Sequence, residues 1–131
     1  MRFVSQKYNT NCFPVALKNC AIYLTRKLDQ SRFIKFCACN TGRSLNIETA
    51  IMLSGLPLEE TKNLEDIFKN GGIITIMHPI INLHSVFCYP YKDRIMCINS
   101  WLGCNELPLF KEELIKWIAK KPNDRMYFID M

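Results

Sequence analysis

One of the seven cysteines stands where the chain can make a thiol reactive. Cys12 opens a stretch of helical periodicity, and Pro14 fits the first turn of that helix, where a missing N–H costs nothing. A thiol is a nucleophile only as the thiolate, and the unpaired N–H groups and positive dipole end of a helix N-terminus stabilise that anion. Cys20, deeper in the same helix, lacks this setting. We therefore predict that Cys12 is a catalytic nucleophile.

A thiol nucleophile needs a base, and the chain contains only two histidines. His84 begins a predicted strand, and a two-residue turn at Lys92-Asp93 joins that strand to the next one. With this turn, Asn99 lies diagonal to His84 on the same face of the sheet. An amide there can accept from the imidazole N–H and fix the orientation of the ring. A slip of one residue would move Asn99 to the other face, so this prediction depends on the turn.

Gln6 completes the set, with five residues between it and Cys12. Acyl transfer from an amide passes through an oxyanion, to which the backbone N–H of Cys12 and the side-chain amide of Gln6 can both donate. One such donor is worth roughly a hundred- to a thousandfold in rate. No one of these residues is distinctive by itself, and it is their ordered combination that indicates thiol catalysis.

This combination resembles papain-like cysteine peptidases, above all the compact branch represented by the bacteriocin-processing peptidase domain of ABC exporters. That family has a Gln, five residues and then a Cys at a helix N-terminus. An apolar strand follows later, then a His that opens the next strand, and then an Asp or Asn. The matching segments here are Gln6-Lys7-Tyr8-Asn9-Thr10-Asn11-Cys12, Gly72-Ile73-Ile74-Thr75-Ile76, His84-Ser85-Val86 and Ile98-Asn99-Ser100-Trp101.

The resemblance implies an α+β papain-like fold, with N-terminal helices packed on a C-terminal antiparallel sheet and residues 1–131 forming a single peptidase domain. It implies a cysteine peptidase that cleaves a peptide or isopeptide bond in a peptide or protein substrate, without a cofactor or metal. By resemblance, Cys12 is the nucleophile and His84 is the base and later the acid. Asn99 then orients His84, and Gln6 is the oxyanion donor. Phe13 replaces the usual Gly after the nucleophile, and we expect its bulk either to narrow the substrate cleft or to alter entry to the site.

Other functions stay open on these residues. If an amine intercepts the acyl-enzyme, the chain is a thiol acyltransferase, and if the target is a side-chain amide, it is a deamidase. The third alternative is a papain-like module that binds without catalysis, which Phe13 alone favours.

The periodicity of the chain predicts the elements that must position these residues. We expect helices over 12–24, 27–37, 45–54, 59–69 and 110–121, and strands over 73–77, 83–91, 94–101 and 126–129. Ser44 is placed to cap the third helix, and Gly55 stands where its C-terminal cap would lie. Because most helices precede the strands, the pattern predicts an α+β fold with an antiparallel sheet.

Composition narrows the function classes further. The 131 residues, 49% hydrophobic and 22% charged, suit a globular domain. The net charge of +5 comes from scattered basic residues and not from a stripe, so no nucleic-acid partner is expected. No segment reaches the roughly 18 apolar residues of a membrane helix. A further protein partner is possible but unidentified.

The cysteines indicate the expected setting. Their odd number and the lack of an apolar N-terminal segment predict free thiols in a reducing cytoplasm. The predicted hairpin places Cys88 directly across from Cys97. Cys37-Ala38-Cys39 is too small a set for a zinc site, which takes about four ligands.

Overall fold

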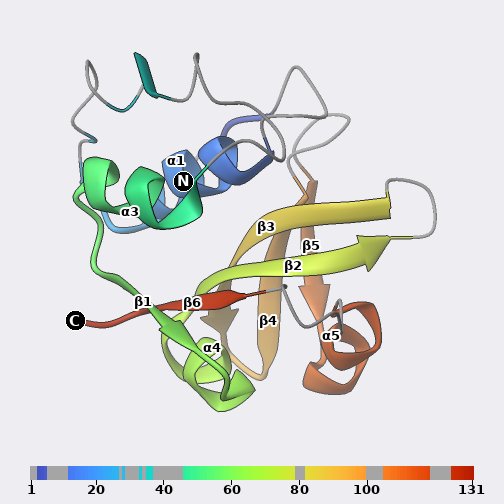
Figure 1. Ribbon diagram of the computed structural model, residues 1–131. Helices are drawn as coiled ribbons and strands as arrows, with labels where there is room; N and C mark the ends of the chain where they lie inside the picture. Colours follow the sequence, from blue (N-terminus) through green and yellow to red (C-terminus); the bar gives the residue numbers. More distant parts are fainter. Residues whose placement is uncertain are drawn as a thin grey trace.

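The computed structural model of the chain has a six-stranded antiparallel sheet with helices on both faces (Figure 1). The structure describes residues 3–5, 12–26, 28, 33, 35–36, 46–78, 82–99, 105–118 and 125–131. At residues 78, 82–84, 99 and 105 it describes the backbone alone.

The strands do not follow their chain order across the sheet. The order is β1-β6-β2-β3-β4-β5, so the last strand lies between the first and the second. The strands are β1 (Leu58–Thr61), β2 (Gly72–His78), β3 (Asn82–Tyr91), β4 (Arg94–Asn99), β5 (Asn105–Leu109) and β6 (Met126–Ile129).

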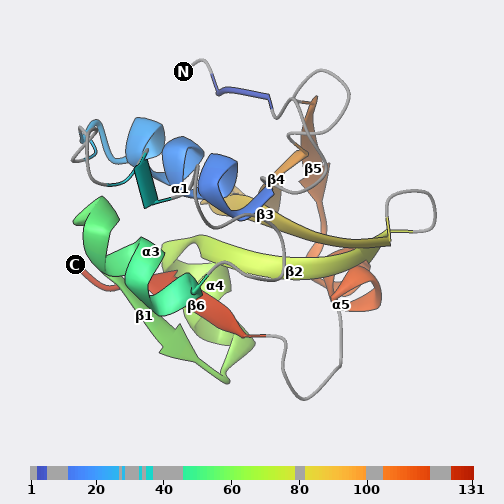
Figure 2. The ribbon, with the colours of Figure 1, turned by 45° about the horizontal axis from the view of Figure 1, so that its top comes forward.

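Helices cover the two faces in pairs, as Figures 1 and 2 show. The helices α1 (Cys12–Tyr23) and α3 (Ile47–Ser54) pack on one face, and α4 (Leu64–Asn70) and α5 (Lys111–Trp117) pack on the other. None of the described helices is long and apolar enough to cross a membrane. The α+β fold class predicted from the sequence is confirmed, with helices and strands more interleaved than expected.

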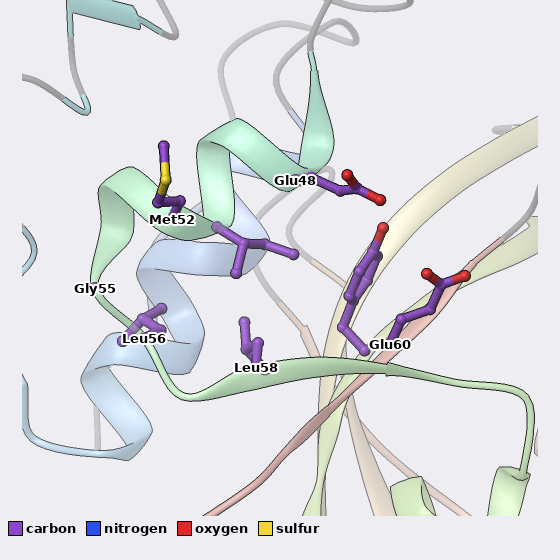
Figure 3. Close-up of a pocket in the computed structure, with 8 residues that line it drawn as sticks. Glu48, Met52, Gly55, Leu56, Leu58 and Glu60 are labelled. Atoms are coloured by element: carbon purple, nitrogen blue, oxygen red, sulfur yellow. The ribbon is translucent and has the colours of Figure 1, made fainter.

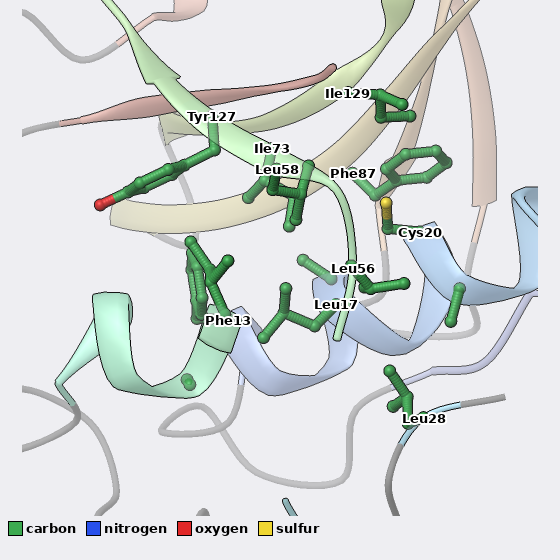
Figure 4. Packing of buried hydrophobic residues seen from close by; sticks show 14 of the residues in the cluster. Phe13, Leu17, Cys20, Leu28, Leu56, Leu58, Ile73, Phe87, Tyr127 and Ile129 are labelled. Atoms are coloured by element: carbon green, nitrogen blue, oxygen red, sulfur yellow. The ribbon is translucent and has the colours of Figure 1, made fainter. Parts of the chain in front are cut away.

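Strand alternation divides the core into two clusters. Successive side chains of a strand point to opposite faces, and Phe87 accordingly packs beneath α1 while Val86 packs on the side of α4 and α5. The first cluster, beneath α1 and α3, includes Phe13, Leu17, Cys20, Ile73, Phe87 and Tyr127 (Figure 4). The second cluster includes Ile67, Ile74, Ile76, Val86, Cys88, Cys97 and Leu114. The sheet is therefore buried on both faces, which explains why Ile73, Ile74 and Ile76 of β2 are all apolar.

The N-terminal half departs from two of the predicted elements. The helix expected over 59–69 is wrong in its first part, because Leu58–Thr61 forms β1 and pairs with β6, and α4 begins only at Leu64. The helix expected over 45–54 begins at Ile47, and its cap is Asn46, whose side chain accepts from the Thr49 N–H at 3.1 Å. Ser44 lies outside the described residues, as does most of the helix expected over 27–37. Gly55 is the predicted C-terminal cap, with φ of 69°.

The C-terminal half contains a strand that the sequence did not predict. β5 forms the edge of the sheet beside β4. The helix expected over 110–121 is shorter, because Ile118 leaves the helix to bridge Ile76 of β2. The strands expected over 73–77, 83–91 and 126–129 are confirmed. The one expected over 94–101 is confirmed over Arg94–Asn99, and residues 100 and 101 lie outside the described part.

Two glycines allow β6 to approach the start of β2. Gly71 has φ of 81°, a conformation that favours glycine, and its carbonyl accepts from the Ile129 N–H at 2.9 Å. A Cβ at Gly72 would collide with the carbonyl oxygen of Tyr127. The pair of glycines therefore has a steric role as well as ending α4.

Candidate active site

Cys12 is the first residue of α1, as the sequence predicted. Its free thiol is half-buried, so a small reagent can reach it. The first turn of α1 contains no acidic residue, so no carboxylate of the helix neutralises the positive end of its dipole. Cys12 thus lies at the helix N-terminus where the sequence analysis placed the predicted nucleophile.

The other described thiols are all buried. Burial raises the pKa of Cys20 to about 12 and that of Cys97 to about 12, and it also raises the pKa of Cys88 well above its usual range. Buried thiols of this kind are inert. Cys12 is therefore the one accessible thiol among the four that the structure describes, with Cys37, Cys39 and Cys104 lying outside that part.

The hairpin that carries the predicted base has the predicted register. Lys92 and Asp93 form its turn, and Cys88 pairs directly with Cys97. One step beyond the Phe87–Ile98 pair, the same register would put Asn99 across from Val86, with the backbone at Asn99 diagonal to the backbone at His84. The pairing from Tyr91–Arg94 to Phe87–Ile98 is confirmed, whereas the diagonal relationship of Asn99 to His84 stays a prediction.

The four proposed site residues are only partly described. His84 pairs with Ile76 of β2, and Asn99 pairs with Asn105 of β5, as backbone positions. Their side chains, and Gln6 as a whole, lie outside the described part of the structure. The assembly of Cys12, His84, Asn99 and Gln6 into one site thus stays a prediction.

Phe13 does not face a cleft. Its side chain is 6% exposed and lies in the first core cluster, where its ring meets the ring of Tyr127 edge-on at 6.2 Å between centroids (Figure 4). The expectation that Phe13 narrows the substrate cleft is therefore wrong, because the helix turns this side chain inward while the neighbouring Cys12 stays accessible. The feature that favoured a module without catalysis is a core residue.

A largely apolar groove is lined in part by Tyr127. It has a volume of about 490 Å³ and lies between α3 and β1, as Figure 3 shows. Its lining residues are Glu48, Ile51, Met52, Gly55, Leu56, Leu58, Glu60 and Tyr127. Arg125 spans its acidic end, with Nη1 at 2.8 Å from Glu48 Oε1 and Nε at 3.6 Å from Glu60 Oε1. The two carboxylates are thus already engaged by a cation of the same chain.

Sequence reasoning missed Asn19, a polar residue of α1 that is 0% exposed. Its Oδ1 accepts from the Val4 N–H at 2.8 Å, and its Nδ2 donates to the Val4 carbonyl at 3.2 Å. The signal in the sequence was weak, because Asn19 stands beside another polar residue, Lys18, between the apolar Leu17 and Cys20. Among the described residues, no group of three or more His, Cys, Asp or Glu side chains is arranged to hold a metal ion.

Comparison with known proteins finds a structural neighbour but no relative in sequence. No protein-family model matches the chain, and no curated protein matches it in sequence. Among solved structures, the chain is similar to the peptidase domain of Streptococcus ComA, a bi-functional ABC transporter involved in a quorum-sensing pathway. The TM-score is 0.67 and the sequence identity 13%, over 97% of this chain and 96% of that domain. The papain-like fold expected from the sequence is confirmed, and at this identity the likeness is one of fold.

Proposed function

We propose that this chain is a papain-like cysteine peptidase with Cys12 as its nucleophile, His84 as its base, Asn99 as the residue that orients His84, and Gln6 as an oxyanion donor. The observation that carries the proposal is an accessible thiol at the first residue of α1, in a chain with the fold of a peptidase domain over nearly its whole length. The hairpin register supports it, because continuing the pairing one step beyond Phe87–Ile98 would set Asn99 diagonal to His84.

The reaction divides amide cleavage into two steps. His84 takes the proton of the Cys12 thiol, the resulting thiolate adds to the carbonyl carbon, and the Cys12 N–H and Gln6 stabilise the oxyanion that forms. His84 then gives a proton to the leaving amine as the C–N bond breaks, which leaves a thioester on Cys12. Water, deprotonated by His84, hydrolyses the thioester and restores the free thiol.

The fold constrains where this chemistry takes place. The helix α1 covers the sheet face formed by Phe87 and Tyr89, whereas Val86 packs on the other face. The proposal therefore requires Cys12 and His84 to meet at the end of the sheet where β3 begins, and not over its middle.

Alkylation with iodoacetamide at about pH 6, followed by mass mapping of all cysteines, tests the proposal. An ordinary thiol with a pKa near 8.5 is about 0.3% ionised at that pH, so only a thiol held as thiolate reacts quickly. We expect Cys12 to be alkylated at least about tenfold faster than the buried cysteines, and His84→Ala to abolish that difference. Cys20→Ala, which removes a buried thiol of the same helix, is the matched control and leaves the Cys12 rate unchanged.

Equal, slow alkylation of every cysteine would contradict the proposal, as would fast alkylation of Cys12 that survives His84→Ala. Cleavage of a peptide library gives the second measurement. Cys12→Ala is expected to lower kcat by at least about a thousandfold, since removing a nucleophile leaves only the contributions of binding and the oxyanion donors.

A further inference from the structure

Asn19 is a buried polar side chain whose hydrogen bonds leave its own helix. Of the residues whose side chains the structure describes, only Asn19 and Ser54 are polar and buried. Ser54 bonds locally, donating to the Ile51 carbonyl and accepting from the Leu56 N–H. Asn19 instead reaches Val4, which lies fifteen residues earlier in the chain. A buried amide is costly unless it is paired, so its partner matters to the fold.

The contact between Asn19 and Val4 is bidentate. The carboxamide accepts from the Val4 N–H at 2.8 Å and donates to the Val4 carbonyl at 3.2 Å, as a neighbouring strand would. The Val4 side chain is 39% exposed, so the pair does not serve to bury Val4. What it fixes is the backbone of the segment 3–5 along α1.

A second contact holds the same segment. The Phe3 ring packs against Phe87 at 6.1 Å and against Tyr89 at 5.9 Å, measured between ring centroids. Both partners belong to the sheet face that α1 covers. Segment 3–5 is thus held by polar bonds to the helix and by ring contacts to the sheet.

The position of Asn19 relates this segment to the nucleophile. Asn19 follows Cys12 by seven residues, which is close to two turns, so both lie on the same side of α1. Gln6, which lies outside the described residues, follows Val4 by only two positions in the sequence.

We infer that Asn19 is a positioning residue, which fixes the chain from which Gln6 donates to the oxyanion beside Cys12. The inference rests on the proposed function, since it assigns Asn19 a role only through Gln6. A donor stabilises an oxyanion well when it is held in place before the reaction, and a donor on an unanchored segment loses that advantage.

Two reagents separate this role from a merely structural one. Iodoacetamide alkylates Cys12 by displacement of iodide, a reaction that forms no oxyanion. p-Nitrophenyl acetate acylates Cys12 through a tetrahedral oxyanion: the thiolate adds to the carbonyl, the bond to p-nitrophenolate breaks, and an acetyl thioester remains. The first rate measures the thiolate, whereas the second also measures the oxyanion donors.

The variant Asn19→Leu keeps the volume of the buried side chain and removes both bonds to Val4. We expect its acylation rate to fall by about ten- to a thousandfold, approaching the effect of Gln6→Ala, while its alkylation rate stays within about twofold of the wild type. The double variant Asn19→Leu/Gln6→Ala should be acylated no more slowly than Gln6→Ala alone, because both changes remove the same contribution, that of the Gln6 donor. Ser54→Ala, which removes the other buried polar side chain, is the matched control and should leave both rates unchanged.

A folding measurement and a replacement variant keep the test decisive. If circular dichroism shows that Asn19→Leu does not fold, Val4→Pro replaces it, because it removes the N–H that donates to Asn19 without altering α1. Equal loss in both rates, no loss in either, or additive loss in the double variant overturns the role of Asn19. A wild-type Cys12 that reacts slowly with both reagents instead overturns the proposed function itself.

Discussion

Burial separates the cysteines of this chain into two chemical types. Cys12 is accessible at a helix N-terminus, whereas Cys20, Cys88 and Cys97 are packed among apolar side chains. A buried thiol stays protonated because the surrounding core cannot solvate its anion. The same element, α1, thus carries an accessible thiol at its first residue and a buried one two turns later.

The buried thiols make stability depend on alkaline pH. The pKa values of Cys20 and Cys97 rise from 9.0 to about 12 on folding, so above about pH 9 the unfolded chain releases protons that the folded protein keeps. Their contribution to stability is full below that pH and is lost as the pH rises toward 12. We expect the free energy of unfolding to fall by about 1.4 kcal/mol per pH unit for each such thiol.

Urea unfolding at about pH 8 and about pH 10 measures this dependence. Cys97→Ala removes one of the titrating groups and should reduce the slope by one thiol's share. A urea midpoint that does not change between the two pH values would show that these thiols are hydrated in the folded protein.

At the scale of elements, the sequence predicted what depends on local pattern. The helix beginning at Cys12 and the strand over 126–129 were predicted correctly, since their periodicity matches the faces they bury. The pairing of Cys88 with Cys97 followed from a two-residue turn, because turn length sets hairpin register. Whether His84 contacts Cys12 could not be derived in this way, since that depends on how α1 and β3 meet in space.

The elements that the sequence missed are the two edge strands. Leu58-Glu59-Glu60-Thr61 contains good helix formers, and only its pairing with β6 makes it β1. β5 contains Pro108, which argues against a central strand but is tolerated at an edge. In both strands the tertiary partner, and not the local pattern, decides the conformation.

Gly72 gives a test of how closely the elements approach. We expect Gly72→Ala to destabilise the protein by about 2 kcal/mol or more, because the added Cβ collides with the Tyr127 carbonyl of β6 and the strands must separate. Gly55→Ala is the control: its φ of 69° is strained for alanine, but no atom lies within 4 Å of the added Cβ, so about 1–2 kcal/mol is expected. Thermal unfolding of both variants gives the comparison, and a smaller loss at Gly72 than at Gly55 would refute the close approach.

At the scale of the whole molecule, the two core clusters share every central strand. β2, β3 and β4 each contribute side chains to both clusters, so neither cluster can lose its packing alone. β6 joins the edge strand β1 to the rest of the sheet, because it pairs with both β1 and β2. This arrangement supports our expectation that residues 1–131 behave as a single domain.

Shortening the chain tests that expectation. A chain that ends before Met126 lacks β6, which leaves β1 without a partner and removes the buried Tyr127 and Ile129. We expect it to lose native circular dichroism entirely, and not only the signal of one strand. A chain that lacks only Met131, which is 80% exposed, should unfold like the full chain. Native-like residual structure in the shorter chain, with its own cooperative transition, would indicate two independent units.

The position of β6 also bears on how the protein is made. Translation delivers β1 and β2 long before the strand that belongs between them, so the edges of both strands stay unpaired on the nascent chain. Pairings between distant segments form slowly, and open strand edges are where unfinished chains associate with one another. The interval between synthesis of Thr61 and synthesis of Met126 is thus the period in which this chain is most exposed to aggregation and most dependent on chaperones.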